Sequence, residues 1–165
     1  LMEKAISELK GEPVEKELEP EITMDVSAYI PEDYISHIDQ RLGAYKRLAR
    51  MDELSELKKF VDELKDRFGP LPVETMYLID KIELKILSRK AGVERLDISD
   101  GKVVVTFQQG NCLDPKKIIN MIQKDPGRFR FAPDGILTIK PSSDNLKDAI
   151  DSTKRTLSEW CVDVV

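Results

Sequence analysis

The most reactive side chains in this 165-residue chain are two cysteines, Cys112 and Cys161, and a single histidine, His37. A cysteine nucleophile needs a partner that lowers the pKa of its thiol, and His37 is the one imidazole available. His37 lies beside Ile38 in an acidic stretch with helical spacing, which favours a surface or capping role over a catalytic dyad. One histidine and two widely separated cysteines cannot supply a zinc framework, so we expect no metal ion and no cofactor. The sequence also has no glycine-rich phosphate-binding motif, and it therefore predicts a chain that is not an enzyme.

Three clustered carboxylates indicate a binding site instead. Asp62, Glu63 and Asp66 fall within little more than one turn of an expected helix, at positions i, i+1 and i+4. Like charges at this spacing repel each other. Arginines of a partner would relieve the repulsion, because a planar guanidinium pairs well with a carboxylate. An ordinary solvated helix face explains the same residues, and both interpretations stay open.

Clustered basic residues suggest another kind of partner, a nucleic acid. Lys46, Arg47 and Arg50 gather next to Tyr45 on a second expected helix. The stretch 128–131 alternates Arg with Phe, a pattern typical of base stacking and equally of a strand with one buried face. The whole chain has 26 basic and 31 acidic residues and a net charge of −5. Little counterion release would therefore drive general nucleic-acid binding.

Hydrophobic periodicity predicts the elements that carry these groups. A strand is expected at 21–28, where apolar and polar residues alternate. A helix is expected at 35–49, and its apolar face includes Ile38 and Leu42.

Two further helices are delimited by their end signals. Asp52 is a suitable N-cap for the helix that carries the carboxylates, and Gly69 and Pro70 end that helix. Pro72 fits the first turn of the next helix, which ends at Gly92.

The second half of the chain predicts a different arrangement. Short strands are expected at 93–98, 102–107, 129–131 and 136–139, with helices that begin after Asp114 and after Ser142 or Ser143. The expected fold class is α+β: an N-terminal strand and a three-helix region, followed by short antiparallel strands with two further helices.

Charge is concentrated at the start of the chain. Residues 1–21 carry seven Glu and three Lys, a net charge of −4. We expect residues 1–20 to be an acidic lead-in helix and linker, and residues 21–165 to be one domain. A chain that starts at Leu1 suggests a piece of a longer protein. Two thiols suit a reducing compartment, and no apolar run approaches the ~20 residues that cross a bilayer, so a cytoplasmic location is expected.

Several motifs resemble the C-terminal domain of bacterial transcription-repair coupling factors. The matching stretches run in order along the chain: Leu1-Met2, Ala5-Ile6 and Leu9-Lys10-Gly11, then Ile30 to Ile35, Arg41-Leu42, Tyr45 to Ala49 and Leu64 to Pro72. They extend to about Gly92, and the remainder fits the family in the layout of its elements.

The resemblance implies a regulatory role. The parent protein would be a large ATP-driven DNA translocase that removes stalled RNA polymerase and recruits excision repair, with its motor upstream of this chain. In that family the C-terminal domain is not catalytic. It packs against a UvrB-like module and masks the surface that binds UvrA. The family's acidic partner-binding positions map onto Glu63 and Asp66, and Asp62 is added here from helix geometry. The alternative is an accessory nucleic-acid-binding module that uses Lys46, Arg47 and Arg50.

Overall fold

The computed structural model describes residues 19–99, 101–108, 115–141 and 145–162. These residues form five strands and five helices: β1 (Glu21–Met24), α2 (Ile38–Ala49), α3 (Leu54–Phe68), α4 (Val73–Ala91), β2 (Val93–Ser99), β3 (Lys102–Phe107), α5 (Pro115–Lys124), β4 (Phe129–Ala132), β5 (Ile136–Ile139) and α6 (Leu146–Val162). The strands make one sheet in the order β1-β2-β3-β5-β4. β1 runs parallel to β2, and the other neighbours are antiparallel. The α+β class is confirmed.

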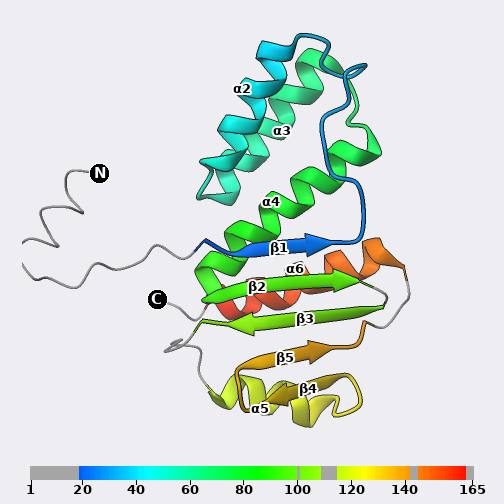
Figure 1. Ribbon diagram of the computed structural model, residues 1–165. Helices are drawn as coiled ribbons and strands as arrows, with labels where there is room; N and C mark the ends of the chain where they lie inside the picture. Colours follow the sequence, from blue (N-terminus) through cyan, green and yellow to red (C-terminus); the bar gives the residue numbers. More distant parts are fainter. Residues whose placement is uncertain (1–18, 100, 109–114, 142–144, 163–165) are drawn as a thin grey trace, which may run out of the picture.

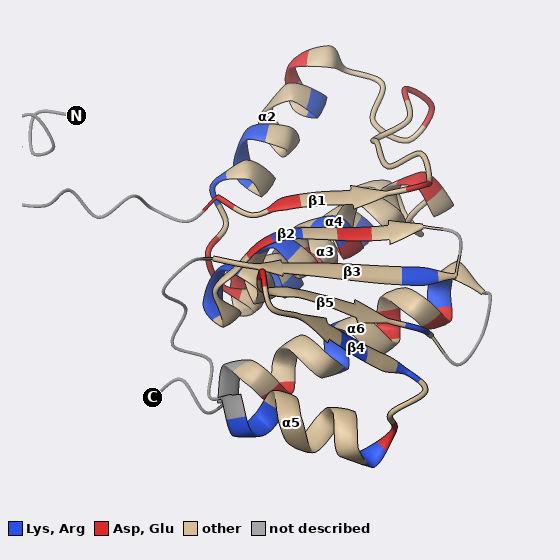
Figure 2. Ribbon diagram, turned by 60° about the horizontal axis from the view of Figure 1, so that its bottom comes forward, with Lys and Arg blue, Asp and Glu red and all other residues tan. Residues whose placement is uncertain are grey.

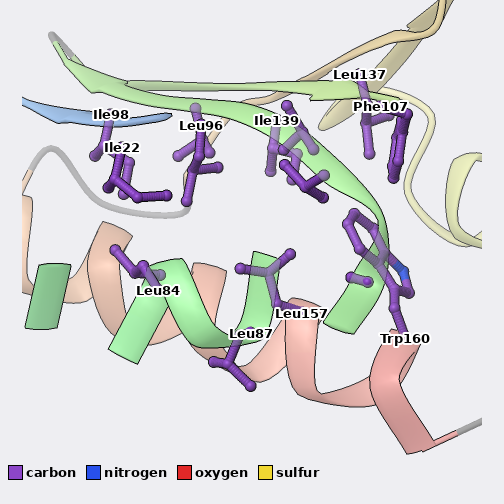
Figure 3. Packing of buried hydrophobic residues seen from close by; sticks show 14 of the residues in the cluster. Ile22, Leu84, Leu87, Leu96, Ile98, Phe107, Leu137, Ile139, Leu157 and Trp160 are labelled. Atoms are coloured by element: carbon purple, nitrogen blue, oxygen red, sulfur yellow. The ribbon is translucent and has the colours of Figure 1, made fainter. Parts of the chain in front are cut away.

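Helices cover one face of the sheet. α4 and α6 lie behind the strands and α5 lies at the β4 side, whereas α2 and α3 extend away from the sheet (Figure 1). Alternate strand residues point toward these helices and are buried. Figure 3 shows this layer, in which Leu96 and Ile98 of β2 face Leu84 of α4, and Trp160 of α6 lies near Phe107. β1 is shorter than the expected strand and ends at Met24.

α4 contributes to two separate hydrophobic cores. Leu84 and Leu87 belong to the core between the sheet and the helices. Leu78 and Ile86 belong to a second core, which α4 shares with α2, α3 and the segment around Ile35. We call these the sheet core and the helical core. Because α4 joins both, it sets the position of α2 and α3 relative to the sheet.

The predicted ends of α3 and α4 are confirmed. Gly69 follows α3 with a φ of +88°, and Gly92 follows α4 with a φ of +75°, conformations that side-chain-bearing residues rarely adopt. Pro72 directly precedes α4.

The N-cap prediction for α3 is wrong, and the one for α6 concerns residues that the structure does not describe. The residue before α3 is Glu53, not Asp52, and the Asp52 carboxylate pairs with Arg89 of α4. Ser142 and Ser143 lie outside the described residues. At the start of α6, the side-chain oxygen of Asn145 accepts a hydrogen bond from the Lys147 backbone N–H at 2.9 Å.

The predicted apolar face of α2 is partly wrong. The helix begins at Ile38, and Ile35 is buried in the preceding loop. Ile38 and Leu42 are 62% and 50% exposed, whereas Ala44 and Leu48 are buried. Because Ile35 reaches the helical core from outside the helix, the buried side of α2 is rotated away from the arc that the spacing suggests.

Candidate functional site

The three clustered carboxylates lie on the outer side of α3. The helix buries three apolar side chains in the helical core, which turns Asp62 and Asp66 to solvent and leaves Glu63 half-exposed. We call Asp62, Glu63 and Asp66 the acidic patch. Among the residues that the structure describes, Asp62 and Asp66 have no ion-pair partner. Their repulsion is therefore not relieved within this part of the chain.

Glu63 differs from its neighbours because an arginine of α2 pairs with it. Arg47 Nη1 lies 2.7 Å from Glu63 Oε2, and the two side chains are 53% and 42% exposed. The Arg47 guanidinium also covers the ring of Phe60, 4.7 Å from its centroid. A carboxylate beside an aromatic face is a good environment for a guanidinium. The structure thus joins one residue of the predicted acidic site to one of the predicted basic site.

An apolar groove between α2 and α3 adjoins this ion pair. Its lining includes Ile35, Phe60 and Leu64, with Arg47 and Glu63 also along it. The space above Gly43, in the same groove, is open: apart from its chain neighbours and the backbone of its own helix, no heavy atom lies within 4 Å of where a Cβ would be. The arrangement offers a partner the half-exposed Glu63 carboxylate at the edge of an apolar groove, a combination suited to an arginine side chain, whose alkyl stem can pack on apolar groups while its guanidinium pairs with a carboxylate.

Tyr34 fixes the end of α3, a role that sequence reasoning missed. Its hydroxyl donates to the Gly69 carbonyl at 2.8 Å and lies 3.2 Å from the Leu64 carbonyl. Its ring lies 5.8 Å from that of Phe68, and burial raises the pKa of its phenol. Tyr34 therefore anchors the turn of helix that carries Asp66. A tyrosine 30 residues earlier in the chain gives no local signal of such a contact.

Arg41 is a second positioning residue that the sequence did not reveal. Its Nη1 donates to the carbonyls of Ile35 and Ser36 at 2.8 and 3.1 Å, and Nη2 lies 3.7 Å from Glu32. These bonds tie the loop before α2 to the helix itself. Only 14% of the Arg41 side chain is exposed, so it is a structural cation and not a free one.

The other predicted basic residues are placed as follows. Lys46 is exposed on α2, and Arg50, the residue directly after α2, is exposed near Arg47. Arg128 donates to Ser152 Oγ of α6 at 2.8 Å and to the Lys140 carbonyl at 3.1 Å, which favours a structural role for that end of the Arg-Phe stretch. Arg130 is exposed on β4.

Of the residues considered for enzyme chemistry, the structure describes the side chain of His37. His37 occupies the N-cap position of α2 and makes no side-chain capping hydrogen bond. Cys112 lies outside the described residues, as does the side chain of Cys161. Among described residues, no three His, Cys, Asp or Glu side chains are grouped to hold a metal ion. None of the described helices is both long and apolar enough to cross a membrane.

Sequence comparison relates this chain to one family. A family model described as "TRCF domain" matches residues 24–118. The chain is 32% identical over 160 residues to a transcription-repair-coupling factor of Myxococcus xanthus, which covers 96% of the chain and 13% of that protein. It is 35% identical over 151 residues to one of Haemophilus influenzae, covering 88% and 13%. The match in Escherichia coli is 31% identical over 165 residues, covering 97% and 14%. The chain therefore spans about one-seventh of the length of these relatives.

A solved structure has a similar fold. The crystal structure of the C-terminal domain of a transcription-repair coupling factor aligns with a TM-score of 0.75 at 19% identity. The alignment covers 88% of this chain and 93% of the other.

Proposed function

This chain belongs to the TRCF domain family, as the C-terminal domain of a transcription-repair coupling factor, and we propose that it acts as a non-catalytic autoinhibitory domain. In this proposal it packs on a UvrB-like module of its own parent protein and masks the surface that binds UvrA. It thereby restrains an ATP-dependent DNA translocase, in the cytoplasm, until RNA polymerase and DNA engage the parent during transcription-coupled excision repair. Residues 1–20 serve as the connector to the motor, and residues 21–165 are the regulatory domain.

The acidic patch is the observation that carries this proposal. Asp62 and Asp66 are exposed on α3, and neither has an ion-pair partner among the described residues. Glu63 is paired with Arg47, in contact with Phe60. Arg47 thus shows that a guanidinium can occupy this carboxylate-and-ring site. An arginine of the UvrB-like module binds at the same patch, to Asp66 directly and to Glu63 in exchange with Arg47.

The energetics suit a clamp that must open. A domain tethered to its target acts at an effective concentration near the millimolar range, so a weak interface keeps the clamp closed. Charge pairs desolvated at its centre contribute most, because truncating one partner of such a pair costs about 2–5 kcal/mol. Charge pairs at an exposed rim contribute about 0–1 kcal/mol. Engagement of the motor needs to supply only a few kcal/mol of differential binding to shift the population.

Charge reversal in the full-length parent tests the proposal. Glu63→Lys with Asp66→Lys should weaken packing on the UvrB-like module and raise UvrA affinity by at least tenfold, since two central pairs become repulsive. The matched control is Glu94→Lys with Asp148→Lys, which makes the same charge change at exposed positions on β2 and α6. UvrA affinity can be measured by titration at fixed salt. Equal affinities for the patch variant and the unaltered protein would show that the patch does not form the interface.

A further inference from the structure

The sheet has one face with no helix over it. α4, α5 and α6 lie on the other face, and in the described chain nothing is stacked on the strands from the front of Figure 1. The strand register decides which residues point to this open face, because paired residues share a face and alternate along each strand. β3 contributes Lys102, Val104 and Thr106.

The open face is electrostatically divided. On its β1–β2 half the charges are already paired with each other. Arg95 of β2 lies 3.1 Å from Asp97 and 4.0 Å from Glu21 of β1. One arginine against two carboxylates leaves this half with a net charge of −1, so it is not where a polyanion would bind.

The β3–β5–β4 half has three cations. Lys102 of β3, Arg130 of β4 and Lys140 just after β5 are all exposed. Within the described residues, none of their side chains has a hydrogen bond or an ion pair. We call these three the basic sheet face, and Figure 2 shows blue positions on β3 and β4 at this side of the sheet.

The register brings these cations close together. β3 pairs with β5 at Val103 and Ile139, so the next positions outward place Lys102 beside Lys140. Arg130 is opposite Thr138 on β5. Neighbouring strands are about 4.8 Å apart and same-face residues about 6.7 Å apart, so the three positions lie within about 10–12 Å of each other. Like charges so placed destabilise a sheet, and a bound polyanion would remove that cost.

We propose that the basic sheet face binds the phosphate backbone of a nucleic acid. Two or three successive phosphates lie over Lys102, Lys140 and Arg130. The hydroxyls of Thr106 and Thr138, half-buried on the same face, can donate to phosphate oxygens. Such contacts position a nucleic acid without reading its bases. This surface is on the sheet side of the domain and is independent of the acidic patch.

The composition of this face favours a nucleic acid over an acidic protein. Protein interfaces draw most of their binding energy from a few residues, enriched in Trp, Tyr and Arg, that fill well-packed, desolvated pockets, and among its described residues this face has no aromatic residue and one arginine. The exposed large apolar side chains of the described chain lie elsewhere, and the apolar members of this face, such as Val104 and Ile136, are half-buried. Cations with hydroxyl donors are sufficient for phosphate contacts.

Salt dependence gives the expected magnitude. Three phosphate contacts to duplex DNA predict that log K falls with log salt with a slope of about −2.7. Between 50 and 200 mM salt this slope corresponds to a loss of about 40-fold in affinity. Removing one cation should reduce the slope to about −1.8 and the loss to about 12-fold. Binding will be weak in absolute terms, because the chain has a net charge of −5.

The experiment uses the 165-residue chain and a fluorescently labelled 20-base-pair duplex, with anisotropy measured at several salt concentrations. The variant Lys102→Ala, Arg130→Ala, Lys140→Ala should lose the salt-dependent binding without a fall in the thermal unfolding midpoint, since it also removes the repulsion among the three cations. The control variant Lys46→Ala, Arg50→Ala, Lys59→Ala removes three exposed cations from the α2–α3 region, on α2, just after α2 and on α3, and it should keep the slope.

Three results would overturn the proposal. The first is no binding of the duplex at low salt. The second is an equal loss in both triple variants, which would indicate non-specific attraction. The third is displacement of the duplex by a polyglutamate peptide at equal charge concentration, which would indicate an acidic protein as the partner. Retained binding in the α2–α3 control with loss in the sheet variant would support the assignment.

Discussion

Arg47 belongs to the predicted basic cluster around α2 and pairs with Glu63 of the acidic patch on α3. Its removal gives a quantitative test of the contact between the two helices. Arg47→Ala deletes an exposed ion pair with Glu63, worth about 0.2–1 kcal/mol. It also deletes a cation–π contact with Phe60, worth about 0.5–1 kcal/mol at an exposed site. We therefore expect Arg47→Ala to lower the free energy of unfolding by about 1–2 kcal/mol. For a domain of this size the thermal midpoint should fall by about 2–8 °C.

The matched control is Lys46→Ala, which removes the same charge from the neighbouring exposed position. That substitution should change stability by less than about 0.5 kcal/mol. Arg47→Lys separates the two contributions, because lysine keeps the charge and loses the planar group that stacks on Phe60. Urea denaturation measures each free energy of unfolding, and a double-mutant cycle with Glu63→Ala isolates the ion pair. If Arg47→Ala and Lys46→Ala have equal effects, or if the cycle shows no coupling with Glu63, the tie between α2 and α3 is refuted.

Two further predictions concern the packing that supports these surfaces. Lys154 of α6 pairs with Asp80 and with Glu83, 2.8 Å away, on α4; burial lowers its pKa, but the two carboxylates outweigh burial, so the pKa is raised. Lys154→Met should lower the free energy of unfolding, measured by urea denaturation, by about 2–3 kcal/mol, which is less than the loss expected for breaking a fully buried ion pair. The control Arg155→Ala, at an exposed position, should lower it by no more than about 0.5 kcal/mol. Because the pKa of Lys154 is higher in the folded than in the unfolded state, its contribution to the free energy of unfolding is complete below about pH 10.4 and is lost as the pH rises through the folded pKa. A loss of this contribution on the acid side instead would contradict the assignment. On α2, the joint substitution Ile38→Ser and Leu42→Ser should leave the thermal unfolding midpoint almost unchanged, whereas Leu48→Ala should lower the free energy of unfolding by about 2–5 kcal/mol. A large fall in the midpoint of the double variant would mean that Ile38 and Leu42 are buried.

Local signals were sufficient for most of the fold. The ends of α3 and α4 could be predicted because Gly69 and Gly92 adopt positive φ angles and Pro72 directly precedes α4. The strand residues of β3 alternate clearly between buried and half-exposed positions. These features depend on a few neighbouring residues, so they are visible in the sequence alone.

The errors on α2 have a common physical origin. Periodicity shows that a helix has an apolar arc, but not how far that arc extends into the core. Ile35 fills the helical core from the loop before α2, and Tyr45 is half-buried with its hydroxyl accepting the Ile30 N–H at 2.7 Å. Ile38 and Leu42 are left outside. Tertiary packing thus decided between two arcs that fit the spacing equally well.

The candidate site was predictable in part for the same reason. The carboxylates Asp62, Glu63 and Asp66 cluster within one helix, so their spacing was enough to find them. The Arg47–Glu63 pair joins residues 16 apart on two helices, and Tyr34 reaches Gly69 across 35 residues. Contacts of this kind depend on how helices pack, which periodicity does not specify. Lys102, Arg130 and Lys140 likewise become neighbours only through the register of the sheet.

The division of α4 between two cores bears on how the domain can be regulated. Leu84 and Leu87 pack in the sheet core, while Ile86 packs in the helical core. A rotation or slide of α4 that improved one set of contacts would disrupt the other, so the helix has little freedom to switch between packed states. Asp52–Arg89 and Lys154–Glu83 pairs further hold α4 to its neighbours on both sides. If the clamp proposed above exists, this packing favours release by exchange of surface partners at the acidic patch, with the domain moving as one body.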